Sequence, residues 1–212
     1  IEQSNPGTPI TDFSHERNRL LEHASHDLFF YVDADEFVSP ELIESMRTII
    51  DTKEEPTVYQ VRYLRTNPEG DRIYRTLREN YQPRMFHRST GVRFEGPTHE
   101  RVIPKVGTKM GRVEAPWYVP TDVYDFQVYK KKIDKRLKLQ AARGDTKRPT
   151  WFLYNALWFP LKETIKSLMR IVLTPFRHGT HAIPATFELR RIYSHFVHAY
   201  FHARQYWRNV FG

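Results

Sequence analysis

Three carboxylates fall within four residues, directly after a short apolar run. The run Leu28–Val32 reads LFFYV, and Asp33, Asp35 and Glu36 follow it. Two carboxylates two residues apart at a strand end can both reach one cation. Mg²⁺ and Mn²⁺ take oxygen ligands from one or two carboxylates and complete their shell with substrate phosphates and water. Because such an ion can neutralise a diphosphate leaving group, the spacing of Asp33 and Asp35 indicates metal-dependent chemistry on a phosphorylated ligand.

This acidic turn has two other interpretations. Carboxylates near a helix N-terminus are favoured by the helix dipole alone, so the turn could serve only to begin the next helix, and this alternative stays open. A calcium loop would use Asp33, Asp35 and Glu44 as its positions 1, 3 and 12. That interpretation fails because Phe37 and Val38 occupy positions that need an oxygen ligand and a glycine.

The elements around the turn predict an α/β fold. The pattern of 14–25 predicts a helix with Ser14 as its N-cap. The continuous apolar run Leu28–Val32 predicts a central strand covered on both faces. A second helix is expected to begin at Ser39, with Pro40 in the first helical position, where proline is tolerated. Helix, buried strand, acidic turn and helix in this order indicate the α/β class.

Farther along the chain, short strands and then basic helices are expected. The turn-forming residues Asn67–Gly70 predict a hairpin. The expected elements are strands at Val58–Leu64, Arg72–Leu77, Arg84–His87 and Val92–Phe94, and helices at 128–143, 151–173 and 184–210.

Charge and composition exclude several classes of protein. The chain has 212 residues, no cysteine, and 33 − 25 = +8 formal charges. Residues 1–100 hold 12 Lys/Arg and 18 Asp/Glu, whereas residues 101–212 hold 21 and 7. A disulfide scaffold, a thiolate zinc site and a cysteine nucleophile are excluded. No apolar run reaches the length of a membrane-spanning helix, and the basic half predicts attraction to a polyanion.

Several motifs together resemble glycosyltransferase family 2, and within it the bacterial lipopolysaccharide-core β-glucosyltransferases. The motifs are Asp12-Phe13-Ser14 with Arg17-Asn18, the segment Phe29–Glu36, Pro83–Phe86, and Gly96 with His99-Glu100. The resemblance runs from about 12 to 105. It implies a GT-A fold and inverting transfer of a hexose, with glucose expected, from a UDP-sugar to a lipid-linked saccharide. Family members begin with strand units that nothing before Ile10 supplies, so we expect the first βα units to be missing from this chain.

The resemblance also implies roles for individual residues around the donor. Asp33 and Asp35 would hold Mg²⁺ or Mn²⁺ on the diphosphate, with Asp35 the stronger candidate. Arg17 and Asn18 would lie near the nucleotide-sugar, and an arginine suits that place because it can bind phosphate oxygens with two parallel hydrogen bonds. Asp12 would contact the donor, and Asp33 is included among the substrate-binding residues.

Inverting transfer needs one base to take the proton of the acceptor hydroxyl. Glu100 is our candidate, and Glu36, next to the metal ligands, is the rival. His99 is expected to be a third metal ligand or an orienting donor, and it too would contact substrate. The alternative that His99 and Glu100 only hydrogen-bond within their loop stays open.

We expect two domains, a partial GT-A catalytic domain at 1–125 and a basic, aromatic helical region at 126–212. The mixture of aromatic, aliphatic and basic residues in 151–173 is typical of a helix in a membrane interface, although a helix packed on the sheet would also show it. We therefore expect a cytoplasmic protein, peripheral on the inner face of the cell membrane, with an anionic membrane surface as partner and no nucleic acid. The histidines at helical spacing, His195, His198 and His202, are interpreted as interfacial or packing side chains.

Two functions of other classes remain as alternatives. One is a non-catalytic membrane-surface binding module whose acidic turn only begins a helix. The other is a metal-dependent phosphodiester hydrolase that uses Asp33 and Asp35.

Overall fold

The chain forms two compact units in the computed structural model. The sheet unit comprises the residues up to Arg65 together with Glu79–Pro120, and the helical unit comprises Thr66–Arg78 and the residues from Thr121 onward. The hairpin residues 66–78, which we expected in the first domain, group with the C-terminal residues. The structure describes residues 12–52, 55–96, 101–121, 125–127, 129–131, 133–134, 137 and 148–211. His99 and Glu100, and part of the predicted helix 128–143, lie outside them.

The sheet unit is built on strands in the order β1-β5-β3-β8-β2. In the part of the chain that is described, β1 lies at an end of this order and pairs antiparallel with β5, so the expected central position is wrong. A continuous apolar run indicates that both faces of a strand are covered, but it does not indicate which strands lie beside it. The strands are β1 Leu28–Phe30, β2 Phe37–Val38, β3 Thr57–Thr66, β5 Asn80–His87 and β8 Lys109–Pro120.

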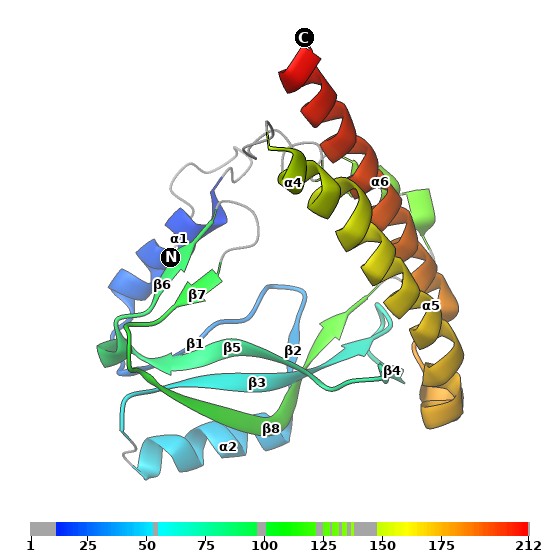
Figure 1. Cartoon of the computed structure of the whole chain (residues 1–212). Helices are drawn as coiled ribbons and strands as arrows, with labels where there is room; N and C mark the ends of the chain where they lie inside the picture. The colour runs from blue at the N-terminus through cyan, green and yellow to red at the C-terminus, as the bar shows by residue number, and fades with distance from the viewer. Residues whose placement is uncertain are drawn as a thin grey trace. The chain divides into compact units, whose positions relative to one another are not determined.

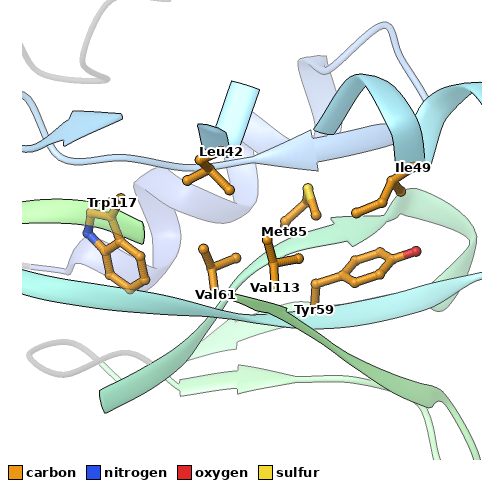
Figure 2. Close-up of a cluster of buried hydrophobic side chains, with 7 residues drawn as sticks. All are labelled: Leu42, Ile49, Tyr59, Val61, Met85, Val113 and Trp117. Carbon is orange, nitrogen blue, oxygen red and sulfur yellow. The ribbon is translucent and has the colours of Figure 1, made fainter. Parts of the chain in front are cut away.

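Helix α2, Pro40–Asp51, covers one face of this sheet (Figure 1). It begins as predicted, because the Ser39 hydroxyl accepts the amide of Leu42 at 3.0 Å and Pro40 takes the first helical position. Leu42 and Ile49 point from α2 into the core shown in Figure 2. The sheet contributes the remaining side chains of this cluster, Tyr59, Val61, Met85, Val113 and Trp117.

The opposite face is covered by α1, Phe13–His23, and by the hairpin of β6 and β7, Arg93–Glu95 and Arg101–Ile103 (Figure 1). The N-cap of α1 is Asp12 rather than Ser14. The Asp12 carboxylate accepts the amide of His15, while the Ser14 hydroxyl donates to the same oxygen.

Successive side chains of a strand point to opposite faces of the sheet, and they pack into a hydrophobic cluster on each face. Phe30 packs against the cluster under α2, and its neighbour Phe29 packs against the second cluster, which centres on Val58, Phe86, Val92 and Phe94. Phe29 and Phe30 are therefore covered on opposite faces of β1, as predicted, but the strand ends at Phe30, and Val32, the last residue of the predicted strand, is 42% exposed. A short 3₁₀ turn, Arg88–Thr90, links β5 to β6.

The helical unit contains an antiparallel pair of long helices, α5 and α6 (Figure 1). The described positions between 126 and 137 are helical as well. The expected helix at 151–173 is part of a longer helical run, and the expected helix at 184–210 is confirmed. The bounds are α4 Pro149–Phe152, a π-helical segment Leu153–Trp158, α5 Phe159–His178, a 3₁₀ turn Gly179–His181, and α6 Ala185–Phe211, with the short strand β4 at Ile73–Tyr74.

Pro160 explains the π-helical segment. A proline inside an α-helix lacks the N–H for its i−4 partner, and its ring clashes with that carbonyl. Just before it, the amide of Phe159 donates to the carbonyl of Tyr154, five residues back. This wider turn lets the helix continue through the proline without a break.

Histidines form the buried side of α6. His195, His198 and His202 are all buried, and the rings of His198 and His202 stack with their centroids 3.9 Å apart. Trp151 stacks on His202, and Phe159 packs on His198, each at 5.0 Å. Of the two expected roles, interfacial or packing, the structure shows packing for these histidines.

Burial keeps these imidazoles neutral. It lowers the pKa of His195, helped by the neighbouring Arg191 and opposed by Glu163, and it also lowers the pKa of His202. Burial, and then the charges of His202 and His195, lower the pKa of His198 to about 4.

Acidification should therefore destabilise the helical unit. Because the pKa of His198 falls from 6.5 to about 4 on folding, the unfolded chain takes up the proton first as the pH drops. The contribution of neutral His198 to the free energy of unfolding is complete above about pH 6.5 and is lost progressively as the pH falls toward 4. The loss should be about 2 kcal/mol for His198 after allowance for solvent screening. Urea unfolding followed by circular dichroism at several pH values measures it.

The contribution of His198 can be isolated by substitution. His198→Gln should reduce the pH dependence of the unfolding free energy, with His195 and His202 supplying the remainder, whereas His181→Gln, at an exposed histidine of the same unit, should leave it unchanged. Equal pH dependence in the wild type and both variants would contradict this account.

Candidate active site

The acidic turn is held at the end of β1 by the strand ladder and by its own glutamate. The amide of Tyr31 donates to the carbonyl of Arg84, which extends the pairing of β1 with β5. The amide of Glu36 then donates to the carbonyl of Asp33 at 3.0 Å. In return, the Glu36 carboxylate accepts the amide of Asp33, also at 3.0 Å. Glu36 thus closes the turn that presents Asp33 and Asp35.

A buried ion pair anchors this turn to β5. The Arg84 guanidinium donates to Glu36 at 3.0 Å, and the two side chains are only 8% and 6% exposed. The guanidinium carbon lies 4.5 Å from the centroid of the Tyr31 ring and 4.9 Å from that of Trp117. Because a buried charge is very costly without a partner, this pair fixes the position of the turn against the sheet.

Asp33 faces two arginines. Its Oδ1 accepts from Arg17 at 2.7 Å, and its Oδ2 lies 3.7 Å from Arg84. Arg17 also lies against the Tyr31 ring, 4.7 Å from its centroid. The Tyr31 hydroxyl donates to the carbonyl of Pro83 at 3.0 Å, which fixes the ring between the arginines and β5. The structure therefore brings Arg17 and Asp33 together, although they lie 16 residues apart.

Asn18 and Asp12 have local structural partners. The Asn18 side chain donates to the carbonyl of Phe94 and accepts the amide of the same residue, both at 2.9 Å, and so ties α1 to β6. Asp12 caps α1, and the hydrogen bonds from Ser14 and His15 lower the pKa of its carboxyl group. Neither side chain makes a described contact with the acidic turn. Their proposed contacts with the donor stay predictions.

Asp35 is exposed, and within the described ranges it has no hydrogen-bond or ion-pair partner. No group of three or more His, Asp or Glu side chains among the described residues could hold a metal by itself. The donor set nevertheless fits Mg²⁺ or Mn²⁺, which use one or two carboxylates together with substrate phosphates. Asp35 offers a free carboxylate for such an ion, whereas the charge of Asp33 is already balanced by arginine.

A separate cavity of about 770 Å³ lies at the other end of β1. Leu28, Ile49 and His87 are among the residues that line it, and the acidic turn is not. It therefore does not belong to the candidate site.

Comparison with known protein families matches residues 11–138 to the family described as Glycosyl transferase family 2. The chain belongs to this family. The match covers more than half of the chain and includes Arg17, the acidic turn and Arg84. Among curated proteins, no match was found. The α/β fold, a curled sheet between helices followed by a helical C-terminal region, is the GT-A-like fold that the resemblance predicted.

Membership also establishes the coarse function. Glycosyltransferases of this family use a nucleotide-sugar donor and an acceptor, so this chain is a glycosyltransferase of the nucleotide-sugar type.

Sequence reasoning missed Arg84, although it lies within the quoted motif Pro83–Phe86. The sequence around Arg84 does indicate that its side chain has a buried partner. A single arginine next to the apolar Met85 and Phe86 in a predicted strand needs a buried partner, and the nearby acidic turn was the obvious source. Trp117 was missed because no strand was predicted at 109–120.

Breaking the Arg84–Glu36 pair should destabilise the sheet unit strongly. Glu36→Gln removes the nearer anion of the buried Arg84 charge and leaves only Asp33, at 3.7 Å, and we expect a loss of about 3 kcal/mol in the free energy of unfolding. The matched control is Glu44→Gln, which breaks an equally direct pair with Arg47 whose side chains are 68% exposed. That change should cost less than about 1 kcal/mol.

Chemical denaturation of both variants measures the difference. Glu36→Gln combined with Arg84→Met should recover part of the loss, because the uncompensated charge is removed. Equal stability of the Glu36→Gln and Glu44→Gln variants would rule out the anchoring role of the buried pair.

Proposed function

We propose that this protein transfers a hexose, glucose by resemblance, from a UDP-sugar to a lipid-linked saccharide during synthesis of the lipopolysaccharide core or a related surface glycan. The observation that carries the proposal is the acidic turn. It lies inside the family match, presents the free carboxylate of Asp35, and is flanked by Arg17. A carboxylate for a cation beside an arginine for phosphate oxygens suits a nucleoside diphosphate.

The donor would be held by charge on both sides of its diphosphate. Asp35, with Asp33, would hold Mg²⁺ or Mn²⁺, and a bound ion would neutralise the charge that develops on the departing UDP. Arg17 is partly exposed and would turn from Asp33 to the phosphate oxygens. Arg84 is buried and would stay with Glu36, so that the turn keeps its position. Asn18 and Asp12 would border this site through α1.

One base suffices for inverting transfer. The acceptor hydroxyl oxygen would form a bond to the anomeric carbon as the bond from that carbon to the diphosphate oxygen breaks. The hydroxyl proton would pass to the base. Glu100 remains our candidate. Glu36 is less suited, because one of its oxygens accepts from Arg84 and the other from the amide of Asp33. His99 would coordinate the metal or orient the substrate.

The proposed location is the inner face of the cell membrane, where a lipid-linked acceptor would be available to a cytoplasmic enzyme. The absence of cysteine suits a reducing compartment, and the basic C-terminal half suits an anionic surface.

Binding of UDP with Mn²⁺ tests the donor site. A ligand that binds only the folded state at about a hundred times its Kd adds about 2.7 kcal/mol of stability. For a chain of this size, that raises the Tm by roughly 5–10 °C. Asp35→Ala should abolish the combined shift and lower the rate of sugar transfer at least about a hundredfold. Asp51→Ala, at an exposed aspartate on α2, should retain both.

The alternatives give different results. A binding module without catalysis would show no shift with UDP and Mn²⁺, or an equal shift in the Asp35→Ala variant. A phosphodiester hydrolase would release nucleotide from the UDP-sugar without an acceptor, whereas a transferase releases UDP when an acceptor is present.

A further inference from the structure

One side of the helical run 153–176 is apolar and exposed. Large apolar side chains recur every three or four residues along it, and each is between 50% and 85% exposed. This spacing places them on one side of the helix. We call them the apolar stripe: Leu153, Leu157, Leu161, Ile165, Met169, Val172 and Phe176.

The apolar stripe is not the side of the helix that packs within the unit. The buried positions of α5 are small or polar and recur every seven residues, at Pro160, Ser167 and Thr174. Contacts with α6 come from the same side, as the hydrogen-bond contact of Thr164 with His195 shows. A helix of a globular unit normally buries its apolar side and exposes its polar side. This helix does the reverse, and the described residues of the unit leave the apolar stripe exposed.

Charge distinguishes between the partners. Residues 148–211 hold 9 Lys/Arg and 2 Asp/Glu. The two acidic side chains, Glu163 and Glu188, are only 16% and 4% exposed. The exposed charge is therefore almost entirely positive. A second copy would bring two positive surfaces together, whereas anionic lipid would attract this surface, at about 1 kcal/mol per cation near the membrane.

Aromatic side chains also favour a lipid interface. Tyr154 and Trp158 are exposed next to the apolar stripe, and these two residue types prefer the depth of the lipid headgroups. Among the helices in the described ranges, none has both the length and the apolar character needed to cross a bilayer. A helix that has an apolar side and basic flanks suits the interface plane.

We propose that the apolar stripe lies in the headgroup region of an anionic membrane, with the helix parallel to its surface. The proposal names the residues that would contact the membrane, and it rests on the membrane location given under the proposed function. Its evidence is independent of the nucleotide-sugar site. Lys166 follows Ile165, and its side chain is 47% exposed and pairs with Glu163 at 2.7 Å; it would turn from this carboxylate to the lipid phosphates.

Sedimentation of the whole protein with lipid vesicles tests this surface. The wild type should bind vesicles of phosphatidylglycerol and phosphatidylcholine at least about tenfold more tightly than vesicles of phosphatidylcholine alone, and high salt should weaken the binding. Leu161→Glu, in the middle of the apolar stripe, should reduce binding to the anionic vesicles at least about tenfold. The matched control Val106→Glu, at a fully exposed valine of the sheet unit, introduces the same charge and should change binding less than about twofold.

Several results would overturn the proposal. They are no binding to anionic vesicles, equal binding to both vesicle types, or equal loss of binding in the two variants. A concentration-dependent dimer that Leu161→Glu disperses would assign the apolar stripe to a second copy instead. The Tm shift with UDP and Mn²⁺ should persist in the Leu161→Glu variant, which also shows that it folds. Vesicle binding without that shift in the wild type would contradict the donor site but not this surface.

Discussion

The buried pair between Arg84 and Glu36 is the interaction on which the candidate site depends. Both charges are removed from water and lie 3.0 Å apart, and the cost of separating them restricts the position of the acidic turn. The Glu36 carboxylate also accepts the amide of Asp33, so the backbone that carries Asp33 and Asp35 is held in position as well. Tyr31 and Trp117 flank the guanidinium and exclude water from the pair. A rigid, charged support beneath an exposed Asp35 is what a site for a doubly charged ion and a diphosphate requires.

Much of the local structure could be predicted from the sequence, because it is set by local rules. The start of α2 follows from Ser39 and Pro40, and the covering of Phe29 and Phe30 on opposite faces of β1 follows from their place in a continuous apolar run. The acidic turn and Arg17 were found through motifs with fixed spacing. Strand β8 was missed even though Val113, Ala115, Trp117 and Val119 alternate toward the core, because Gly111 and Pro116 interrupt its pattern.

The remaining features depend on contacts between distant residues, which local patterns do not encode. The place of β1 in the sheet is set by hydrogen bonds with β5. The partner of Arg84 lies 48 residues away. The family motif predicts that Asn18 lies near the nucleotide-sugar, and in the structure its side-chain amide hydrogen-bonds the backbone of Phe94. In the C-terminal half, composition predicted an amphipathic helix, but only the packing of α5 on α6 shows which side is exposed.

The central claim is that the anchored turn presents Asp35 to a divalent ion together with the donor diphosphate. Electron paramagnetic resonance of Mn²⁺ tests it most directly, because the signal of free Mn²⁺ falls when the ion is bound. We predict that the wild type lowers the free signal in the presence of UDP well beyond the effect of UDP alone, and that an Asp35→Asn variant does not. An equal decrease in both proteins, or none in the wild type, would contradict the claim.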